Sequence, residues 1–316
     1  MDTINYSNRS HLKVQLIESP LDVLPQISNC SSWNKFDDSP YWYSCSNQNG
    51  DMIVINRYSD RVWAAYSLMK IKYFSKIMED WVTHNLDLDY CWLPPSHLKN
   101  IGKRQSWKEK GIGIKYNDIL SDETNQSQVS LKAWFGSNRD ILDSIEKLSD
   151  KFAISSLRFK DYETSTVSEW YSSGKITFNA SDDIQCVFKA INDSLDIYDS
   201  ELKTATKLRD YKKGSFEFEF TQKIDLNAYS ETVKKGKSDL KLWMTETESA
   251  PDFKRFRGVD MHTWDRIFLD LGSNYAYMTV PGKGCVNAAP RLVTVQGETL
   301  MGKTQVYYNG DEIFVQ

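Results

Sequence analysis

Apolar and polar positions along the chain follow two different periods, and each period predicts a different kind of element. Residues 216–220 (FEFEF) alternate strictly, which is typical of a strand that buries one face. The longest helical pattern lies at 181–211, where apolar residues recur at every third or fourth position. Ser181 is a favoured N-cap residue, and Asp182 and Asp183 complement the positive end of a helix dipole. The sequence therefore predicts one long helix over this range.

The same two periods predict the other elements of an α+β fold. The first 40 residues, which contain three prolines, are expected to be irregular. Asn309-Gly310 suits a type I′ turn, so residues 305–315 are predicted to form a hairpin, and the segment after 236 is mostly strand. These elements predict mixed or antiparallel sheets with hairpins, backed by helices. The remaining predicted strands are 52–56, 61–66, 89–93, 129–135, 152–159, 167–171, 175–179 and 275–280, and the remaining helices are 71–82, 95–102, 137–148 and 226–235.

A change of composition near residue 125 predicts two domains. Residues 121–128 (SDETNQSQ) contain no apolar side chain and form the most linker-like stretch of the sequence. At 316 residues the chain is long enough for two ordinary domains. We therefore expect an N-terminal α+β domain over 1–125 and a C-terminal α+β domain with a β-rich end over 126–316.

Composition indicates a folded, soluble protein of the cytoplasm. Apolar residues make up 40% and charged residues 26% of the chain, close to the averages of folded globular proteins. No run of about 20 apolar residues is present to span a bilayer, and the first ten residues lack the apolar core of a signal peptide. The five cysteines are odd in number and far apart, which favours reduced thiols over disulfides or a zinc ribbon.

Basic residues gather in three runs, although the net charge of the chain is −4. Between Lys99 and Lys115 the only acid is Glu109, and Trp107 lies inside this run, where a base could stack on its ring. The second run ends the long predicted helix, and the third is interleaved with phenylalanines. If the runs share one face, they form a surface that tracks a nucleic-acid backbone. The residues predicted to bind nucleic acid are Lys99, Lys103, Arg104, Trp107, Lys108, Lys110, Lys115, Lys207, Arg209, Lys212, Lys213, Lys254, Arg255 and Arg257.

The favoured hypothesis is a non-catalytic binding subunit of an intracellular assembly, which contacts nucleic-acid backbone and a protein partner. Ten Trp and 17 Tyr exceed what a chain of this size needs, and aromatic rings are enriched at protein interfaces. A purely protein-binding scaffold is an alternative that uses the aromatic residues and leaves the basic runs as solvated side chains. No cofactor and no membrane partner are expected under either hypothesis.

A further alternative is a Mg²⁺-dependent nuclease or phosphodiesterase. Asp239 and Lys241 form an acid-x-Lys triplet before an apolar strand, and Asp225 is an earlier acid that could share a metal with them. Acid-x-Lys triplets are common in charged chains, so the pattern has poor specificity. Magnesium is expected only under this hypothesis.

Two short segments carry side chains that metal sites or nucleophilic catalysis use. On a strand, Asp260 and His262 share a face and supply half of a metal site, although a hydrogen-bonded structural histidine is the favoured interpretation. Cys285 follows the loop 281–284, which is interpreted as a tight turn beside a buried thiol, with an anion-binding nest as the alternative. As a nucleophile Cys285 needs a neighbouring base, for which His262 is the near candidate.

Residues 297–304 (GETLMGKT) match the phosphate-binding pattern G-x-x-x-x-G-K-[ST] letter for letter. That pattern holds phosphate at the N-terminus of a helix that follows it, and here a predicted hairpin follows instead. No nucleotide partner is therefore expected.

Overall fold

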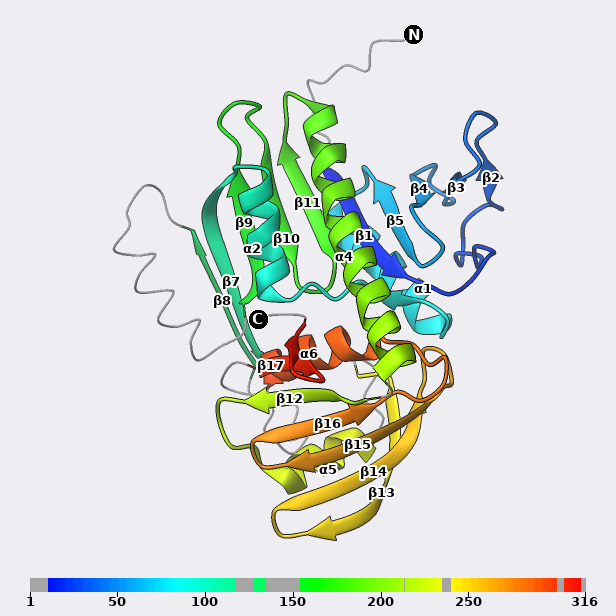
Figure 1. Ribbon diagram of the computed structural model, residues 1–316. Helices are drawn as coiled ribbons and strands as arrows, with labels where there is room; N and C mark the ends of the chain where they lie inside the picture. The colour runs from blue at the N-terminus through cyan, green and yellow to red at the C-terminus, as the bar shows by residue number, and fades with distance from the viewer. Residues whose placement is uncertain are drawn as a thin grey trace.

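The computed structural model describes residues 11–117, 128–134, 154–212, 214–234, 240–299 and 304–313, and it confirms the predicted α+β fold. The described strands form two antiparallel sheets, one of 11 strands and one of seven. α6 (Ala288–Thr299) lies between the two sheets, and α4 (Ile184–Lys212) runs across the larger sheet towards the smaller one (Figure 1).

The larger sheet runs in the order β2-β3-β4-β5-β1-β11-β10-β9-β7-β8, and β6 pairs with the end of β1. β1 is central because Val14 and Leu16 alternate with polar residues and are fully buried on one face. This strand corrects the expectation that the first 40 residues are irregular, since the three prolines all follow it. The strand bounds are β1 Leu12–Glu18, β2 Asn34–Lys35, β3 Trp42–Ser46, β4 Met52–Arg57, β5 Val62–Ser67, β6 Asp89–Tyr90, β7 Lys108–Asn117, β8 Gln128–Trp134, β9 Ile154–Lys160, β10 Val167–Tyr171 and β11 Lys175–Ala180.

The larger sheet takes strands from both sides of the domain boundary predicted at 125/126. β7 and β8 flank that position, and they pair with each other from Gly111 opposite Trp134 to Asn117 opposite Gln128. In the described chain, the change from one sheet to the other falls between α4 and β12, because all strands of the smaller sheet follow α4.

The smaller sheet runs in the order β13-β14-β15-β16-β12-β17-β18. β12 covers the residues predicted from strict alternation, and its three phenylalanines are buried. β17 and β18 form the predicted hairpin, and both turn residues have positive φ, 51° at Asn309 and 86° at Gly310, as a type I′ turn requires. The strand bounds are β12 Phe216–Phe220, β13 Leu242–Ala250, β14 Phe253–Asp260, β15 Arg266–Gly272, β16 Tyr275–Thr279, β17 Thr304–Tyr308 and β18 Asp311–Glu312.

The helices α1, α2, α4 and α5 match predictions from the sequence, whereas α6 does not. α6 is buried nearly all round, so no exposed polar face marks it in the sequence: Ala289, Leu292 and even the charged Arg291 are at most 1% exposed. The helix predicted at 137–148 lies outside the described residues. In the part of the chain that the structure describes, no helix is both long and apolar enough to cross a bilayer. The remaining helix bounds are α1 Ile71–His84, α2 Pro95–Arg104 and α5 Leu226–Lys234.

Helices pack on both faces of the larger sheet. The apolar stripe of α4 buries Ile191, Leu195 and Tyr198 in one core, and α1 buries Phe74 and Trp81 in a second core on the other face. Burying one aliphatic or phenyl side chain contributes about 1.5–3 kcal/mol to the free energy of unfolding, relative to leaving it exposed. These two cores fix the larger sheet, and α6 then lies where the larger sheet meets the smaller one.

Candidate functional site

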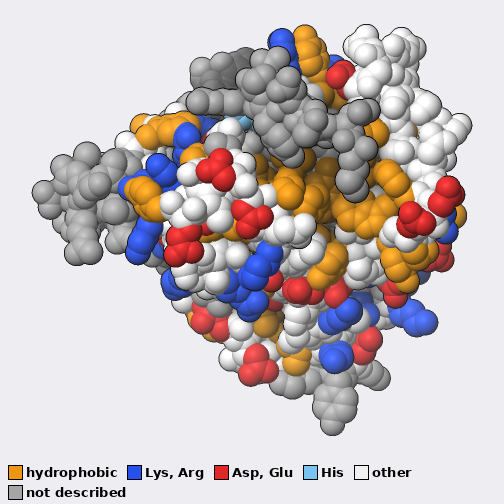
Figure 2. Space-filling view, turned by 90° about the horizontal axis from the view of Figure 1, so that it is seen from above, with side chains coloured by type: hydrophobic (Ala, Val, Ile, Leu, Met, Phe, Trp, Pro, Cys, Tyr) orange, Lys and Arg blue, Asp and Glu red, His pale blue; other side chains and the backbone are white. Residues whose placement is uncertain are grey.

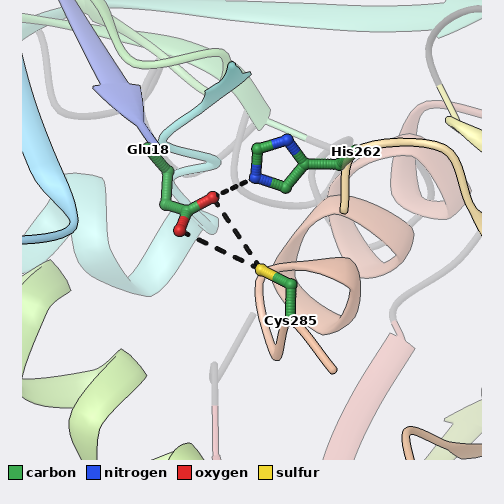
Figure 3. A group of neighbouring side chains, drawn as sticks. All are labelled: Glu18, His262 and Cys285. Atoms are coloured by element: carbon green, nitrogen blue, oxygen red, sulfur yellow. Dashed lines mark hydrogen bonds and ion pairs between the residues drawn. The ribbon is translucent and has the colours of Figure 1, made fainter. Parts of the chain in front are cut away.

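Three buried side chains from distant parts of the chain meet beside the first turn of α6 (Figure 3). Glu18 is the last residue of β1, His262 lies in the turn after β14, and Cys285 lies in the loop before α6. His262 Nε2 is 2.5 Å from Glu18 Oε2, and Cys285 Sγ is 3.8 Å from the same oxygen. All three residues are at most 3% exposed, so this group, here called the Glu18 cluster, is shielded from bulk solvent.

Strand pairing and a tight turn hold two members of the Glu18 cluster in place. Glu18 pairs with Val62 in β5 and with Asp89 in β6, so its backbone is held on both sides. The turn that carries His262 is fixed by Asp260, whose carboxylate accepts the backbone N–H of His262 at 3.0 Å. Both side chains therefore start from rigid backbone.

The loop before α6 turns tightly and presents the third member, Cys285. Gly282 has a φ of 65°, in the left-handed region that favours glycine, and the Gly284 N–H donates to the Pro281 carbonyl at 3.2 Å. Cys285 Sγ accepts the backbone N–H of Asn287 at 3.3 Å, which occupies one of the N–H groups that α6 leaves free at its start. This loop is the tight turn beside a buried thiol that the sequence favours.

Hydrogen bonds determine where His262 carries its protons. Its Nδ1 lies 2.8 Å from the carbonyl oxygen of Leu86, which can only accept, so Nδ1 is protonated. Burial alone lowers the pKa of His262, but the charge of Glu18 and the contacts of the ring with Glu18 and Cys285 together raise that pKa well above its usual value. His262 is therefore an imidazolium that is paired with the Glu18 carboxylate.

Arg61 connects the Glu18 cluster to the surface. Its Nε donates to Glu18 Oε1 at 2.6 Å, and its Nη2 donates to the same oxygen and, at 3.1 Å, to Cys285 Sγ. Burial alone raises the pKa of Glu18, but His262 and Arg61 together lower it, so the carboxylate is ionised. Burial also raises the pKa of the Cys285 thiol. The Arg61 side chain is 39% exposed, so it reaches solvent while the other three groups do not.

A second buried polar network surrounds Arg291 of α6. Arg291 donates to Asp89 at 2.5 Å and to Asp260 at 2.6 Å. Asn287 donates to Asp89 at 2.9 Å and accepts the hydroxyl proton of Tyr198, on α4, at 2.5 Å. Buried charges are stable only when they are paired and hydrogen-bonded, so this network fastens both sheets, α4 and α6 to one another.

The Glu18 cluster combines a thiol, an imidazole and a carboxylate, three side-chain groups that bind zinc. The sequence related His262 to Cys285 only as a possible base, and nothing in it pointed to Glu18. Both ring nitrogens of His262 have oxygen acceptors as hydrogen-bond partners, and the raised pKa of the ring makes it a poor base for the nearby thiol. The geometry therefore suits a hydrogen-bonded or metal-binding histidine better than a base beside a nucleophile.

The residues proposed for a magnesium-dependent nuclease make separate contacts. Asp225 caps α5, where its Oδ1 accepts two backbone N–H groups at 2.9 and 3.1 Å. Lys241 is buried, and its Nζ donates to the carbonyl of Leu88. Asp239 lies outside the described residues. Asp225 and Lys241 thus have no contact in common.

The phosphate-binding pattern at 297–304 spans the end of a helix and the start of a strand, which is the order opposite to that of a phosphate-binding loop. α6 ends at Thr299 and β17 begins at Thr304, so the pattern starts in the last turn of a helix and ends on the first residue of a strand. Residues 300–303 lie outside the described part of the chain. A helix N-terminus is what holds the phosphate in such loops, and here a strand stands in its place.

The three basic runs lie on separate elements: α2 and β7, the end of α4, and β14 of the smaller sheet. Trp107 is 6% exposed and packs on Phe159, so its ring does not offer a stacking surface. Arg209 is buried and donates to the Gly284 carbonyl. Lys213 lies outside the described residues. Among the described members, those with exposed side chains are Lys103, Arg104, Lys108, Lys207 and Arg257.

Carboxylates neutralise much of the third run. Lys254 is 8% exposed, and its Nζ lies 3.4 Å from Glu246. Arg255 pairs with Asp270 and with Glu248, each at 2.8 Å. Because these cations are already paired and lie on the smaller sheet, they do not extend a surface on α2 and β7.

A set of cations that the sequence did not single out as a group lies over aromatic rings beside the larger sheet. The Arg158 guanidinium lies 3.8 Å from the ring centre of Trp134. Lys110 and Lys160 lie 5.4 and 4.7 Å from the ring centre of Tyr162. Trp134 is 58% exposed and Tyr162 is 59% exposed, so both rings remain accessible.

The pairing of the strands places a third aromatic ring, with two further cations over it, on the same face of the larger sheet. Lys132 and Lys175 lie 4.9 and 4.3 Å from the ring centre of Tyr171. Arg158 pairs with Glu169, and Tyr171 is two positions further along β10, so Arg158 and Tyr171 share a face. In the view from above, blue and orange side chains lie together at the left of Figure 2, on the side where Figure 1 shows β7 to β9. The cation–aromatic surface consists of Lys110, Lys132, Trp134, Arg158, Lys160, Tyr162, Tyr171 and Lys175.

Comparison with known proteins gives the chain a family. Over 308 residues it is 21% identical to a protein of Methanocaldococcus jannaschii named "Uncharacterized protein MJECL33", in an alignment that covers 79% of this chain and 74% of that relative. The family model described as MJECL33-like protein matches residues 3–312, a range that includes the Glu18 cluster and the cation–aromatic surface. Because this match extends over almost the whole sequence, the chain belongs to the MJECL33-like protein family.

Proposed function

We propose that this chain is a non-catalytic binding subunit that holds single-stranded nucleic acid on its cation–aromatic surface. The observation that supports the proposal is that five cations lie within 5.4 Å of the centres of three aromatic rings on neighbouring strands and the loop beside them. The proposal moves the site from the three basic runs of the sequence to this surface, which shares only Lys110 with the predicted residues.

The surface combines the two kinds of contact that single strands need. Cations neutralise phosphates, and aromatic rings stack on bases without regard to base identity. Trp134 and Tyr162 offer accessible rings, and Arg158 and Lys160 lie against them. Glu169 is an acid on the same face, but Lys132 already pairs with it at 2.8 Å. Four further cations of the surface, Lys110, Arg158, Lys160 and Lys175, lie over its rings beside this pair.

Two features of the chain extend the proposal beyond the surface itself. Lys108 is exposed at the start of β7, two positions before Lys110, so it lengthens the path available to a phosphate backbone. The five cysteines are free thiols, which suits work in the reducing cytoplasm. In this proposal a protein partner supplies whatever chemistry is performed on the bound strand.

Fluorescence anisotropy with labelled single-stranded DNA, single-stranded RNA and duplex DNA tests the proposal. Both single strands, or one of them, are expected to bind more tightly than the duplex. The logarithm of the association constant is expected to fall with the logarithm of salt concentration, with a slope of about −0.7 per phosphate neutralised. Failure to bind either single strand at low salt overturns the proposal.

Variants with matched controls locate the bound strand. Trp134→Ala removes a stacking ring and is expected to cost about 1–3 kcal/mol of binding, a loss of roughly 5- to 150-fold. Trp243→Ala is the control, because Trp243 is 60% exposed but lies on β13 of the smaller sheet. Lys160→Gln is compared in the same way with Lys76→Gln on α1. If each variant and its control lose the same binding affinity, the nucleic-acid strand does not bind on the cation–aromatic surface.

A further inference from the structure

We propose that Glu18, His262 and Cys285 together bind one zinc ion where the two sheets meet. The proposal depends on the Glu18 cluster alone, so it stands or falls independently of nucleic-acid binding. It differs from the sequence interpretation, in which Asp260 was the partner of His262, because Asp260 is instead paired with Arg291.

The separations of the three donor atoms suit three of the four ligand positions around a tetrahedral ion. All three lie within 4.8 Å of one another, and Cys285 Sγ is 3.8 and 4.0 Å from the two oxygens of Glu18. Zinc bound to nitrogen, oxygen and sulfur at its usual bond lengths of about 2.0–2.3 Å holds these atoms about 3.3–3.6 Å apart. The sulfur–oxygen separations are already close to this range. The 2.5 Å contact between His262 and Glu18 opens by about 1 Å when the ion replaces the shared proton.

The hydrogen bond from His262 to Leu86 orients the imidazole as a metal ligand. A histidine that binds metal through one ring nitrogen usually donates its other N–H to a carbonyl or a carboxylate. Here Nδ1–H donates to the Leu86 carbonyl at 2.8 Å, which leaves Nε2 directed at Glu18 and close to Cys285 (Figure 3). The ring thus needs no rotation to present a nitrogen lone pair to the ion.

Arg61 and Asn287 support the other two donors. Arg61 holds Glu18 Oε1, so Oε2 is the oxygen turned towards His262. The sulfur of Cys285 accepts N–H groups from Arg61 at 3.1 Å and from Asn287 at 3.3 Å, and such bonds stabilise a thiolate. A zinc ion is neutralised by one carboxylate and one thiolate, and Arg61 keeps its contact with the distal oxygen.

The donor set favours zinc over magnesium and calcium, because thiolate and imidazole are poor ligands for those two cations. The ligands also come from distant parts of the chain: 244 residues separate Glu18 from His262, and 267 separate Glu18 from Cys285. A bound ion therefore crosslinks β1 of the larger sheet to the turn after β14 and to the start of α6. Because the unfolded chain lacks this site, zinc is expected to stabilise the folded state.

The test uses the full chain, purified without chelator under reducing conditions, together with a Cys285→Ser variant. The wild-type protein is expected to contain close to one zinc per chain by mass spectrometry of its metals. Cobalt added to the zinc-free protein is expected to give the intense absorption of a cobalt–thiolate bond, which zinc then removes. Cys285→Ser is expected to lose this absorption and the thermal stabilisation by zinc.

Cys91→Ser is the matched control, because Cys91 is also fully buried but lies outside the Glu18 cluster. It is expected to keep the cobalt–thiolate absorption. X-ray absorption of the zinc-loaded wild type gives an answer that needs no variant, and one sulfur with nitrogen or oxygen ligands is expected. Wild-type protein that takes up neither metal, or a Cys285→Ser variant that keeps the absorption, overturns the proposal.

Discussion

Arg291 and Asp89 are 202 residues apart in the sequence and form a buried ion pair, with Nη1 2.5 Å from Oδ2. The other terminal nitrogen of Arg291 donates to Asp260 of the smaller sheet at 2.6 Å. The three side chains are at most 1% exposed, so water cannot replace a missing partner. The position of α6 between the sheets thus depends on a charge that is stable only while both acids are present.

Arg291→Ala is expected to lower the free energy of unfolding by about 3–5 kcal/mol, because it leaves two buried carboxylates without their cation. Urea denaturation measures this loss. Arg255→Ala is the matched control, since Arg255 also bridges two acids, Asp270 and Glu248, but its side chain is 40% exposed. The control is expected to lose at most about 1 kcal/mol. Similar losses in the two variants would contradict the importance of burial.

Tyr198→Phe is expected to lower the free energy of unfolding by about 1–3 kcal/mol, because two buried groups lose their partner. The Tyr198 hydroxyl donates to Asn287 at 2.5 Å and accepts the Trp92 N–H at 3.0 Å. Tyr58→Phe serves for comparison, since its hydroxyl donates to Asp196 at an exposed site and water can take its place. Thermal and urea unfolding of both variants are expected to show the larger loss at Tyr198.

Elements with one buried and one exposed face were predictable from the sequence. β12 matches 216–220, because strict alternation records which face is buried. The long helix was also predicted, although its N-cap is Asp183, whose Oδ1 accepts the Gln185 N–H at 2.8 Å. Ser181 lies two residues too early for this role. Such features depend on neighbours within a few residues, so the sequence displays them directly.

The Glu18 cluster could not be predicted because its members meet only in the folded chain. Glu18 ends an alternating strand, and the first histidine or cysteine that follows it in the sequence is Cys30, which is not a member of the cluster. α6 was missed for a related reason, since a helix buried on nearly every side shows no two-faced pattern. The residues of the three basic runs were predicted to bind nucleic acid because they are close together in the sequence within each run. The sequence does not show whether a charged side chain is exposed, and in the structure Arg209 is buried and Lys254 is paired with Glu246.

The Glu246 carboxylate makes the free energy of unfolding depend on pH in the acid range. Hydrogen bonds from Ser230 at 2.6 Å and from Lys234 lower the pKa of Glu246 from 4.5 to about 2. The folded state therefore holds this proton less readily than the unfolded state does. The resulting stabilisation is complete above about pH 4.5 and is lost as the pH falls towards 2.

Glu246→Gln measures this dependence, because glutamine has no charge to lose. The difference in free energy of unfolding between wild type and variant is expected to shrink as the pH falls through that window. Ser230→Ala removes the largest cause of the shift, so the pKa of Glu246 is expected to move back towards its ordinary value. A difference that stays constant from neutral to acid pH would contradict the assignment.

Trp107 and Trp134 are expected to separate stability from nucleic-acid binding. Trp107 is 6% exposed and packs on Phe159, so Trp107→Ala leaves a cavity and costs about 3–5 kcal/mol of folding stability. Trp134 is 58% exposed and contacts Arg158, so Trp134→Ala costs at most about 1 kcal/mol of folding stability while it weakens binding. Urea unfolding and oligonucleotide anisotropy on the same preparations measure both effects. If folded Trp107→Ala lost as much affinity as Trp134→Ala, the exposed ring would not be the contact that holds the strand.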